Sequence, residues 1–383
     1  MYEYKHNIYD KLVFSDFIKS NHAKYYDQIF LLSLEVMSMD ELESIKQKHN
    51  AQKKKCIFLS MSEPQWYDEG SFISTQWNKL VELLRQTQIF NTDFFVPCFG
   101  NEYQNELNVL NQNYYGWNFI KYNVDLPFAN DDILELQNKD DFGNSNLGDI
   151  QYKFIHMNFT HRMHRQLFSK FLIKEDLTAG NCVAINTGST EAGDTIHNES
   201  HEILFGSKAC VPVNQRDDWH YSKDLLDLWA EIPVTDHGHP AIDQNYGRAN
   251  HSFCRLGAVY VVSETVFNHP HPNFSEKTVS ALLSNRPFII IGAYGSLRTL
   301  KEKGFKTFDN FIDESYDNIK DPNQRMKQLF NTVKKINEKT LDQLVAHVKD
   351  STEKFFHNSK LMMNTIGKYK NNYEPQQEIK NAS

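Results

Sequence analysis

Two arginines follow an apolar run shortly before the middle of the chain and could bind phosphate. The run at 152–159 has the composition of a buried strand, and Arg162 and Arg165 come directly after it, where a helical pattern begins. Helix N-terminal amides and planar guanidinium groups both favour phosphate oxygens, so this strand-to-helix junction is a candidate diphosphate clamp. The simpler alternative is that both arginines lie on a solvated helix face.

A second junction combines a helix cap with two opposite charges. Ser275 is a good N-cap residue, Glu276 falls in the first helical turn, where the helix dipole favours an anion, and Lys277 follows. A carboxylate can accept from both hydroxyls of a ribose and an ammonium can meet phosphate charge, so the pair fits a nucleotide; a plain capped helix is the alternative. A further carboxylate, Glu264, ends the apolar run at 258–264 at the same expected sheet edge, where polar loops could also solvate it.

The histidines suggest a different chemistry. The chain has 16 of them, and three short spacings bring ligand-type residues together: His197 with Glu199, His237 with His239, and His269 with His271. A His-x-Glu pair with a distant histidine could form the two-histidine, one-carboxylate face of a nonheme iron enzyme. That architecture is a jelly roll of many short strands, whereas this chain alternates strands with helices. We therefore expect most of these histidines at the surface or in loops, and no metal site.

The elements that must position these residues alternate between strands and helices. Apolar runs at 29–35, 55–61 and 93–99 are separated by amphipathic stretches, and the same alternation restarts at 152–159. This pattern predicts parallel sheets that helices cover on both faces. In such sheets the ligand lies beyond the carboxyl ends of the strands, where the junctions described above would fall.

A polar and acidic stretch separates the two alternating regions. Between Asp125 and Asp149 the sequence is rich in Asn, Asp and Gly, as in a linker. A chain of 383 residues is long enough for two domains. We therefore expect an α/β protein with a Rossmann-like domain at 1–148, a second at 149–340, and a helical tail at 341–383 that packs back across the domains.

Charge and hydropathy exclude several classes of protein. The net charge of −8 argues against a strong nonspecific grip on nucleic acid, although a strip from Lys53 to Lys55 could be locally basic. No run approaches the roughly 18 to 20 apolar residues of a membrane span. The N-terminus lacks a signal-peptide pattern, so we expect a cytoplasmic protein. The five cysteines have no CxxC spacing and are expected to be reduced core residues.

A longer string of residues around these junctions resembles a known family. In chain order it comprises Glu276-Lys277, Arg286-Pro287-Phe288, Gly292, Gly295-Ser296-Leu297, Gly304-Phe305, Phe308 and Asp313-Glu314-Ser315-Tyr316-Asp317. Over about residues 150 to 340 the chain is similar to the donor-binding half of phage and bacterial glycosyltransferases distantly related to the α1,3-fucosyltransferases. The segment 153–172 looks like that family's strand and Arg-x-x-Arg junction, with Asn158 at the strand end. The N-terminal half shows no comparable match.

The resemblance implies two Rossmann-like domains with a cleft between them, the arrangement called GT-B. It implies that Arg162, Arg165 and Lys277 contact the donor diphosphate and that Glu276 contacts the nucleoside. The full expected donor-binding set is Asn158, Arg162, Arg165, Glu264, Ser275, Glu276 and Lys277. One departure is the insertion-like stretch 265–274, whose two His-Pro pairs the family pattern does not explain.

Glycosyl transfer needs the departing nucleoside diphosphate to be neutralised and, if configuration is inverted, a base that takes the acceptor proton. GT-B sites usually neutralise with basic side chains and helix dipoles, and the chain has no Asp-x-Asp triplet, so we expect metal-independent transfer without a cofactor. One candidate base is Glu63, after the run at 55–61, in a loop that could equally be a solvated acidic turn with Asp68 and Glu69. The other is Asp236, and a retaining reaction without an enzymic base stays open.

The nucleotide-sugar donor and its acceptor are not specified by the sequence. A glycan or a hydroxylated small molecule is slightly favoured as acceptor, and a hydroxymethylated base of phage DNA is the second acceptor class. A phage-encoded enzyme would act in the host cytoplasm. Two rival classes are a metal-dependent enzyme built on the histidines and a non-catalytic nucleotide-binding module, although a pure scaffold would not need Arg162, Arg165, Glu276 and Lys277 at the sheet ends.

Overall fold

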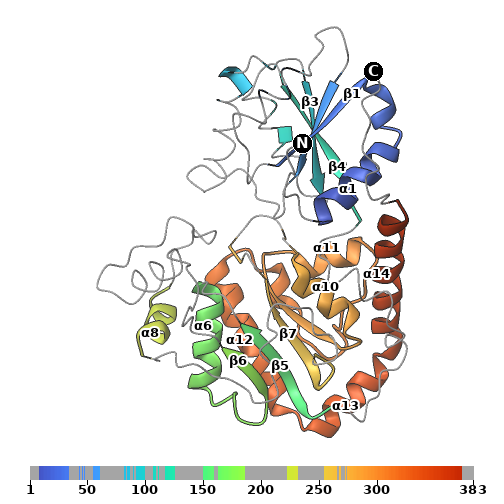
Figure 1. Cartoon of the computed structure of the whole chain (residues 1–383). Coiled ribbons are helices and arrows are strands. Elements are labelled where there is room, and N and C mark those ends of the chain that lie inside the picture. The colour runs from blue at the N-terminus through green and yellow to red at the C-terminus, as the bar shows by residue number, and fades with distance from the viewer. Residues whose placement is uncertain are drawn as a thin grey trace, which may run out of the picture. The chain divides into compact units, whose positions relative to one another are not determined.

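The computed structural model of the chain describes residues 8–33, 55–60, 92–99, 117–125, 150–158, 163–185, 222–231, 254–264 and 274–372, together with single positions or short stretches between some of these ranges. Contacts divide the chain into two compact units. Unit 1 comprises Met1–Gln137 and Asn364–Ser383, and unit 2 comprises Asn138–Met363. Each unit contains a four-stranded parallel sheet, and a series of helices ends the described chain (Figure 1). The expected α/β class with two Rossmann-like sheets is confirmed.

The sheet of unit 1 runs in the order of the sequence. Its strands are β1 (Gln28–Ser33), β2 (Lys55–Ser60), β3 (Thr92–Cys98) and β4 (Trp117–Asn123), and each pairs in parallel with the next. Helix α1 (Ile8–Lys19) and the short helix η1 (Ala23–Tyr25) precede β1. Because this order never reverses, the described strands of unit 1 contain no topological switch point, the position where such sheets most often bind a ligand.

Aromatic rings form the core of unit 1. Phe17 of α1 lies on the sheet, with its ring centroid 4.9 Å from that of Phe58 and 4.6 Å from that of Phe95. The ring of Tyr122 meets that of Phe17 edge-on, with centroids 5.2 Å apart. The Tyr122 hydroxyl donates to Asp16 of α1 at 2.8 Å. Rings that pack at these distances gain energy beyond the burial of their area, so they hold α1 against β2, β3 and β4.

The sheet of unit 2 starts in its middle. Its strands are β5 (Tyr152–Asn158), β6 (Cys182–Ile185), β7 (Gly257–Ser263) and β8 (Phe288–Ile291), and their spatial order is β6-β5-β7-β8, with all neighbours parallel. The chain therefore leaves β5 toward one edge and returns to β7 on the other side. The carboxyl ends of β5 and β7 form a topological switch point, where ligands bind in open α/β sheets.

The helices of unit 2 cover both faces of this sheet (Figure 1). They are α6 (Met163–Lys174), α8 (Lys223–Glu231), α10 (Glu276–Leu283), α11 (Ser296–Glu302), η5 (Ser315–Asn318), α12 (Pro322–Glu338), α13 (Leu341–Asp350) and the first part of α14 (Thr352–Asn372). Phe171 of α6 stacks on Phe330 of α12 with centroids 4.1 Å apart. On the other face, the Ser359 hydroxyl of α14 donates to Leu282 O of α10 at 3.1 Å.

Helix α14 contributes to both units. Its Asn358 side chain accepts from Lys306 N at 2.7 Å and donates to Lys306 O at 2.8 Å within unit 2. Its Tyr369 is buried in unit 1, and the tyrosine hydroxyl accepts from Asp125 N at 3.1 Å. The domain boundary expected after residue 148 lies in the segment 126–149, which is outside the described residues. The expected domain bounds therefore remain a prediction. None of the helices described combines the length and the apolar content needed to cross a membrane.

A buried histidine lies within the sheet of unit 2. His156 of β5 is fully buried, its Nδ1 lies 3.2 Å from Val261 O, and its ring meets Phe168 edge-on at 4.8 Å. Its Nε2 has no hydrogen-bond partner. Burial lowers the pKa of His156 from 6.5 to about 4, and the nearby Arg165 charge adds to that effect, while the contact with Val261 opposes it. The imidazole is therefore neutral in the folded protein at neutral pH.

This histidine predicts that unit 2 loses stability in mild acid. Because the pKa of His156 is lower in the folded than in the unfolded state, its contribution is fully present above about pH 6.5 and is lost as the pH falls toward 4. Between pH 7 and pH 5 the loss is about 2 kcal/mol. Urea unfolding at both pH values checks it, with His156→Leu as the variant that cannot titrate. An equal loss of stability in the wild type and in the variant would contradict the prediction.

Candidate functional site

The candidate site lies at the carboxyl ends of β7 and β8 in unit 2. Strand β7 ends at Ser263, and the N–H of the next residue, Glu264, donates to Ile291 O of β8 at 2.9 Å. Four expected donor-site residues meet here, because Glu264 follows β7 while Ser275, Glu276 and Lys277 begin α10. The structure therefore brings together two junctions that are separate in the sequence.

The carboxylate of Glu264 supports the start of α10. It is fully buried and accepts from Ser275 N, 3.2 Å from each oxygen, from the Ser275 hydroxyl at 2.6 Å, and from the Thr278 hydroxyl at 2.5 Å. A buried carboxylate requires such donors, and the positive end of the helix dipole adds to the compensation. Glu264 therefore holds the helix N-terminus to the end of β7, and its described contacts are all structural.

The main-chain carbonyl of Glu264 is held from the opposite side by α6. Arg165 donates to this oxygen from Nε at 3.1 Å and from Nη2 at 2.9 Å, and His164 Nε2 lies 3.0 Å away. Arg165 is only 3% exposed. Its guanidinium group thus faces the protein main chain, where it connects α6 to β7, instead of pointing out from a solvated helix face.

Glu276 and Lys277 form a partly exposed ion pair at the first turn of α10. The carboxylate and the ammonium are 2.5 Å apart, and their side chains are 29% and 27% exposed. Ser275 is the N-cap, and its hydroxyl accepts from Lys277 N at 3.3 Å. Burial acts to raise the pKa of Glu276, but the Lys277 charge and hydrogen bond, the helix backbone and the more distant Arg165 together lower it below its ordinary value. The carboxylate is therefore ionised and open to hydroxyl donors.

Gly292 leaves room for this arrangement. It follows β8 beside Glu264, and a Cβ at this position would lie 3.1 Å from both Ile290 Cγ2 and Ser296 Oγ and 3.6 Å from Glu264 Cβ. A side chain here would press on Ile290 and on Ser296 at the start of α11, whereas its contact with Glu264 would be an ordinary van der Waals contact. This close packing gives a physical reason for a glycine at position 292.

A second buried carboxylate caps α11, the helix that follows β8. Asp317 of η5 accepts from Leu297 N at 2.8 Å and from Arg298 N at 2.9 Å, and its own carbonyl accepts from Gly295 N at 3.0 Å. Burial raises the pKa of Asp317, while the two main-chain donors and the Arg298 charge oppose that rise. In the sequence, Asp317 stood out only as part of the shared string of residues, and its capping role was not predicted. That role joins Asp317 to Leu297, 20 positions earlier, so no local sequence pattern indicates it.

Several expected site residues cannot be compared with the structure. Asn158 is the last residue of β5, at the switch point, but its side chain is not described. Arg162, Glu63 and Asp236 lie outside the described residues, as do the six histidines and acids of the alternative metal site: His197, Glu199, His237, His239, His269 and His271. Within the described part of the chain, no group of three or more His, Cys, Asp or Glu residues could hold a metal ion. Sequence reasoning missed Thr278, although its place three residues after the N-cap Ser275 puts it in the capping turn.

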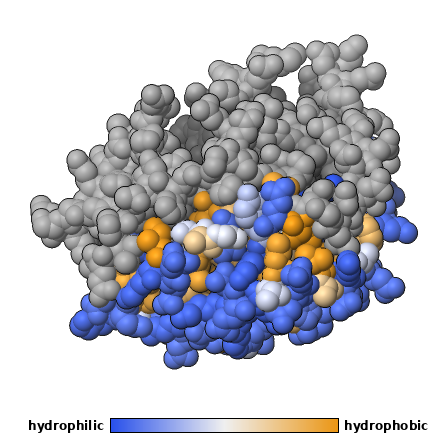
Figure 2. All heavy atoms as spheres, turned by 90° about the horizontal axis from the view of Figure 1, so that it is seen from below, coloured by the Kyte–Doolittle hydropathy of each residue, from blue (hydrophilic) through white to orange (hydrophobic). Residues whose placement is uncertain are grey.

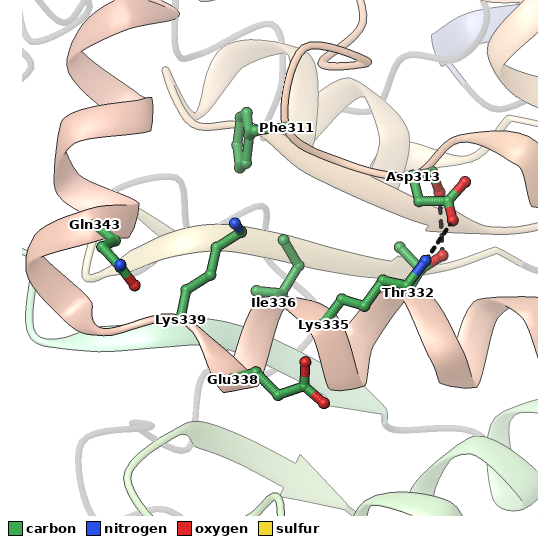
Figure 3. Close-up of a pocket in the computed structure, with 8 residues that line it drawn as sticks. All are labelled: Phe311, Asp313, Thr332, Lys335, Ile336, Glu338, Lys339 and Gln343. Carbon is green, nitrogen blue, oxygen red and sulfur yellow. Dashed lines mark hydrogen bonds and ion pairs between the residues drawn. The ribbon is translucent and has the colours of Figure 1, made fainter.

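A surface hollow lies at the opposite end of the sheet. Phe311, Thr332, Ile336 and Lys339 help to line it, and Asp313 and Lys335 pair within it at 2.9 Å (Figure 3). Its floor is the last part of α12, whose Asn337 O accepts from Lys153 at the start of β5. Seen from this end, the described surface is mostly hydrophilic (Figure 2). The hollow is thus remote from the carboxyl ends of the strands, and two of its charged residues, Asp313 and Lys335, already pair with each other.

Comparisons with known proteins give one weak similarity. No family model matches the chain, and no curated protein matches it. Among solved structures, a chain from the crystal structure of the GtfA/B complex is similar, with a TM-score of 0.30 and 10% identity over 87% of this chain and 61% of that chain. The chain therefore spans about 61% of the length of the protein it matches. A similarity of this size does not define an activity, and the resemblance to fucosyltransferases stays a prediction.

The contacts of Glu264 predict that its removal loosens α10. In Glu264→Ala, Ser275 and Thr278 lose a charged acceptor in a buried place, so the free energy of unfolding should fall by about 3 kcal/mol. Hydrogen exchange should accelerate at the first amides of α10. Glu302→Ala, at an exposed glutamate of α11, is the matched control and should change neither measurement. Unaltered exchange in α10 of Glu264→Ala would show that the carboxylate does not support the helix.

Proposed function

We propose that this protein is a glycosyltransferase that moves a sugar from a nucleotide-sugar donor to a hydroxyl acceptor. The observation that carries the proposal is the partly exposed Glu276–Lys277 pair at the start of α10, which lies at the carboxyl edge of a sheet with a switch point. A carboxylate for ribose hydroxyls and an ammonium for phosphate are side by side where an α/β sheet binds nucleotides.

The donor-site roles follow from this placement. Glu276 accepts hydrogen bonds from the nucleoside ribose, for which its lowered pKa keeps it ionised, and Lys277 moves from its pair with Glu276 toward the diphosphate. Glu264 and Ser275 support the donor site by fixing the first turn of α10. The remaining proposed contacts are Asn158, Arg162 and Arg165; the last of these would have to leave the Glu264 carbonyl, or act through its charge from where it lies.

The proposed reaction needs no cofactor and no metal ion. The acceptor oxygen forms a bond to the anomeric carbon of the sugar, and the bond from that carbon to the phosphate oxygen breaks. Basic side chains and the N-terminus of α10 stabilise the departing diphosphate. In an inverting reaction a base takes the proton of the acceptor hydroxyl. Glu63 and Asp236 remain the candidates for this base, and a retaining reaction would need neither.

The arrangement of the proposed enzyme is GT-B, with the acceptor bound by the N-terminal Rossmann-like unit. The proposed acceptor is a glycan or a hydroxylated small molecule, since the net charge of −8 disfavours the alternative, a hydroxymethylated base of phage DNA. The proposed compartment is the cytoplasm, which is that of the host if a phage encodes the protein.

A screen of thermal stability tests this function. Nucleoside diphosphates and nucleotide sugars are added one at a time, with and without EDTA. One nucleotide should raise the melting temperature by a few degrees at a concentration of about 100 Kd, and EDTA should leave this rise unchanged. The rise should vanish in Glu276→Ala and persist in Glu302→Ala, the exposed control.

Two other outcomes would contradict the proposal. If no nucleotide raises the melting temperature and EDTA lowers it, the histidine-based metal enzyme becomes the better explanation. If a nucleotide sugar binds through Glu276 but the protein releases no nucleoside diphosphate from it, alone or with any acceptor of a glycan and DNA panel, the chain is a nucleotide-binding module without catalysis.

A further inference from the structure

Two cations approach the same tyrosine ring beyond the end of β8. Arg298 Cζ lies 4.8 Å and Lys320 Nζ lies 5.6 Å from the ring centroid of Tyr294. Arg298 also donates from Nη1 to the Tyr294 hydroxyl at 3.1 Å. Tyr294 and Arg298 are partly exposed, and Lys320 is exposed. We call these three residues the cationic cluster. A ligand in solvent can reach it.

The backbone at Gly295 is shaped around the arginine of the cationic cluster. Gly295 has φ of +78°, a left-handed conformation that side chains disfavour. A Cβ at this position would lie 2.5 Å from Arg298 Nη2 and 3.1 Å from Arg298 Cζ. The glycine therefore permits both the turn and the position of the guanidinium. The Arg298 main chain is fixed as well, because its N–H is bound by the buried Asp317.

The lysine of the cationic cluster is positioned by a buried arginine. Arg325 is 1% exposed, and its Nη1 donates to Ile319 O at 2.8 Å and to Lys320 O at 2.9 Å. Its Nη2 donates to Phe267 O at 2.6 Å, so the same guanidinium fixes the loop that follows β7. Among the described carboxylates, none forms an ion pair with Lys320. Its positive charge therefore faces solvent beside that of Arg298, an arrangement that a bound anion would stabilise.

The cationic cluster neighbours the proposed donor site. Ser263 and Ile291 are paired at the ends of β7 and β8. The start of α10, which Glu264 holds at the end of β7, and the start of α11 after β8 therefore belong to neighbouring strand ends. A nucleoside diphosphate is long enough to reach across two neighbouring strands, which lie about 5 Å apart in a sheet. It also carries more negative charge than Lys277 can balance, and the guanidinium of Arg165 is directed at a main-chain carbonyl.

We propose that Arg298 and Lys320, held on Tyr294, bind the diphosphate of the nucleotide donor together with Lys277. This inference depends on the proposed transferase function and adds two residues that no motif had indicated. As the bond from sugar to phosphate breaks, the negative charge that develops on the leaving oxygen is shared among these cations. Charge-assisted hydrogen bonds from a guanidinium and an ammonium are suited to this role.

Calorimetric titration of the full-length protein tests the inference. The probes are ADP, GDP, UDP, CDP and dTDP, the corresponding nucleosides, inorganic pyrophosphate and a DNA duplex. Arg298→Gln and Lys320→Gln should each weaken binding of the preferred diphosphate about tenfold and leave binding of its nucleoside unchanged. Lys327→Gln is the matched control, because this partly exposed lysine of α12 pairs with Asp224 and should not affect any probe. Melting temperatures establish that each variant is folded, and Lys320 can be replaced without removing a buried contact.

The alternatives separate failure of the cationic cluster from failure of the transferase function. If a nucleoside diphosphate binds through Glu276 and neither Arg298→Gln nor Lys320→Gln weakens it, the inference is wrong and the function stands. If pyrophosphate binds through the cationic cluster while no nucleotide binds, the cluster is an anion site but not part of a nucleotide-donor site, and the inference is overturned. If both variants weaken binding of duplex DNA and not of nucleotides, the cluster contacts an acceptor and the inference is overturned. If none of the probes binds, both the inference about the cationic cluster and the proposed transferase function are wrong.

Discussion

The carboxylate of Glu264 is fully buried, and the protein compensates its charge with the N-cap of α10 and with the Thr278 hydroxyl. A carboxylate in such a place cannot rely on water, so α10 has to begin where its donors meet it. The carbonyl of the same residue receives Arg165 and contacts His164, which fixes α6 against the end of β7. One residue thus sets the positions of two helices at the switch point. The Glu276–Lys277 pair is oriented because the turn beneath it is held in this way.

The junction between β8 and α11 also has a buried carboxylate at the start of the helix, but this carboxylate comes from a different part of the chain. The buried carboxylate at the start of α11 belongs to Asp317, which comes after this helix in the sequence. The buried carboxylate at the start of α10 belongs to Glu264, which comes before that helix. Arg325 then joins the segment after Asp317 to the loop at Phe267, and the Phe267 ring stacks on His164 at 5.5 Å. Interactions between side chains and main chain therefore connect the carboxyl ends of β7 and β8 with α6 and with Phe267. Such a network holds polar groups in fixed directions, which a binding site requires.

Four strands could be predicted from the sequence because they are continuous apolar runs. Parallel strands covered on both faces are continuous apolar runs, and those at 29–35, 55–61, 152–159 and 258–264 became β1, β2, β5 and β7 with ends that differ by one or two residues. The start of α10 was also predictable, because an N-cap acts on neighbours within its own turn. The contact partners of the charged side chains could not be predicted. Arg165 and Glu264 are 99 residues apart, and their contact follows from the order β6-β5-β7-β8, which no local pattern encodes.

Helix α14 has a consequence for how the protein is made. Its 21 residues extend about 31 Å, and the change from unit 2 to unit 1 falls within the helix, after Met363. The strands of unit 1 are translated before those of unit 2, yet Tyr369, which is buried in unit 1 and accepts from Asp125 N, is translated after the strands of unit 2. Unit 1 therefore lacks its C-terminal segment until α14 has been translated. A fragment that stops before α14 would lack part of unit 1 as well as part of unit 2, so the two units cannot be separated by cutting the chain once.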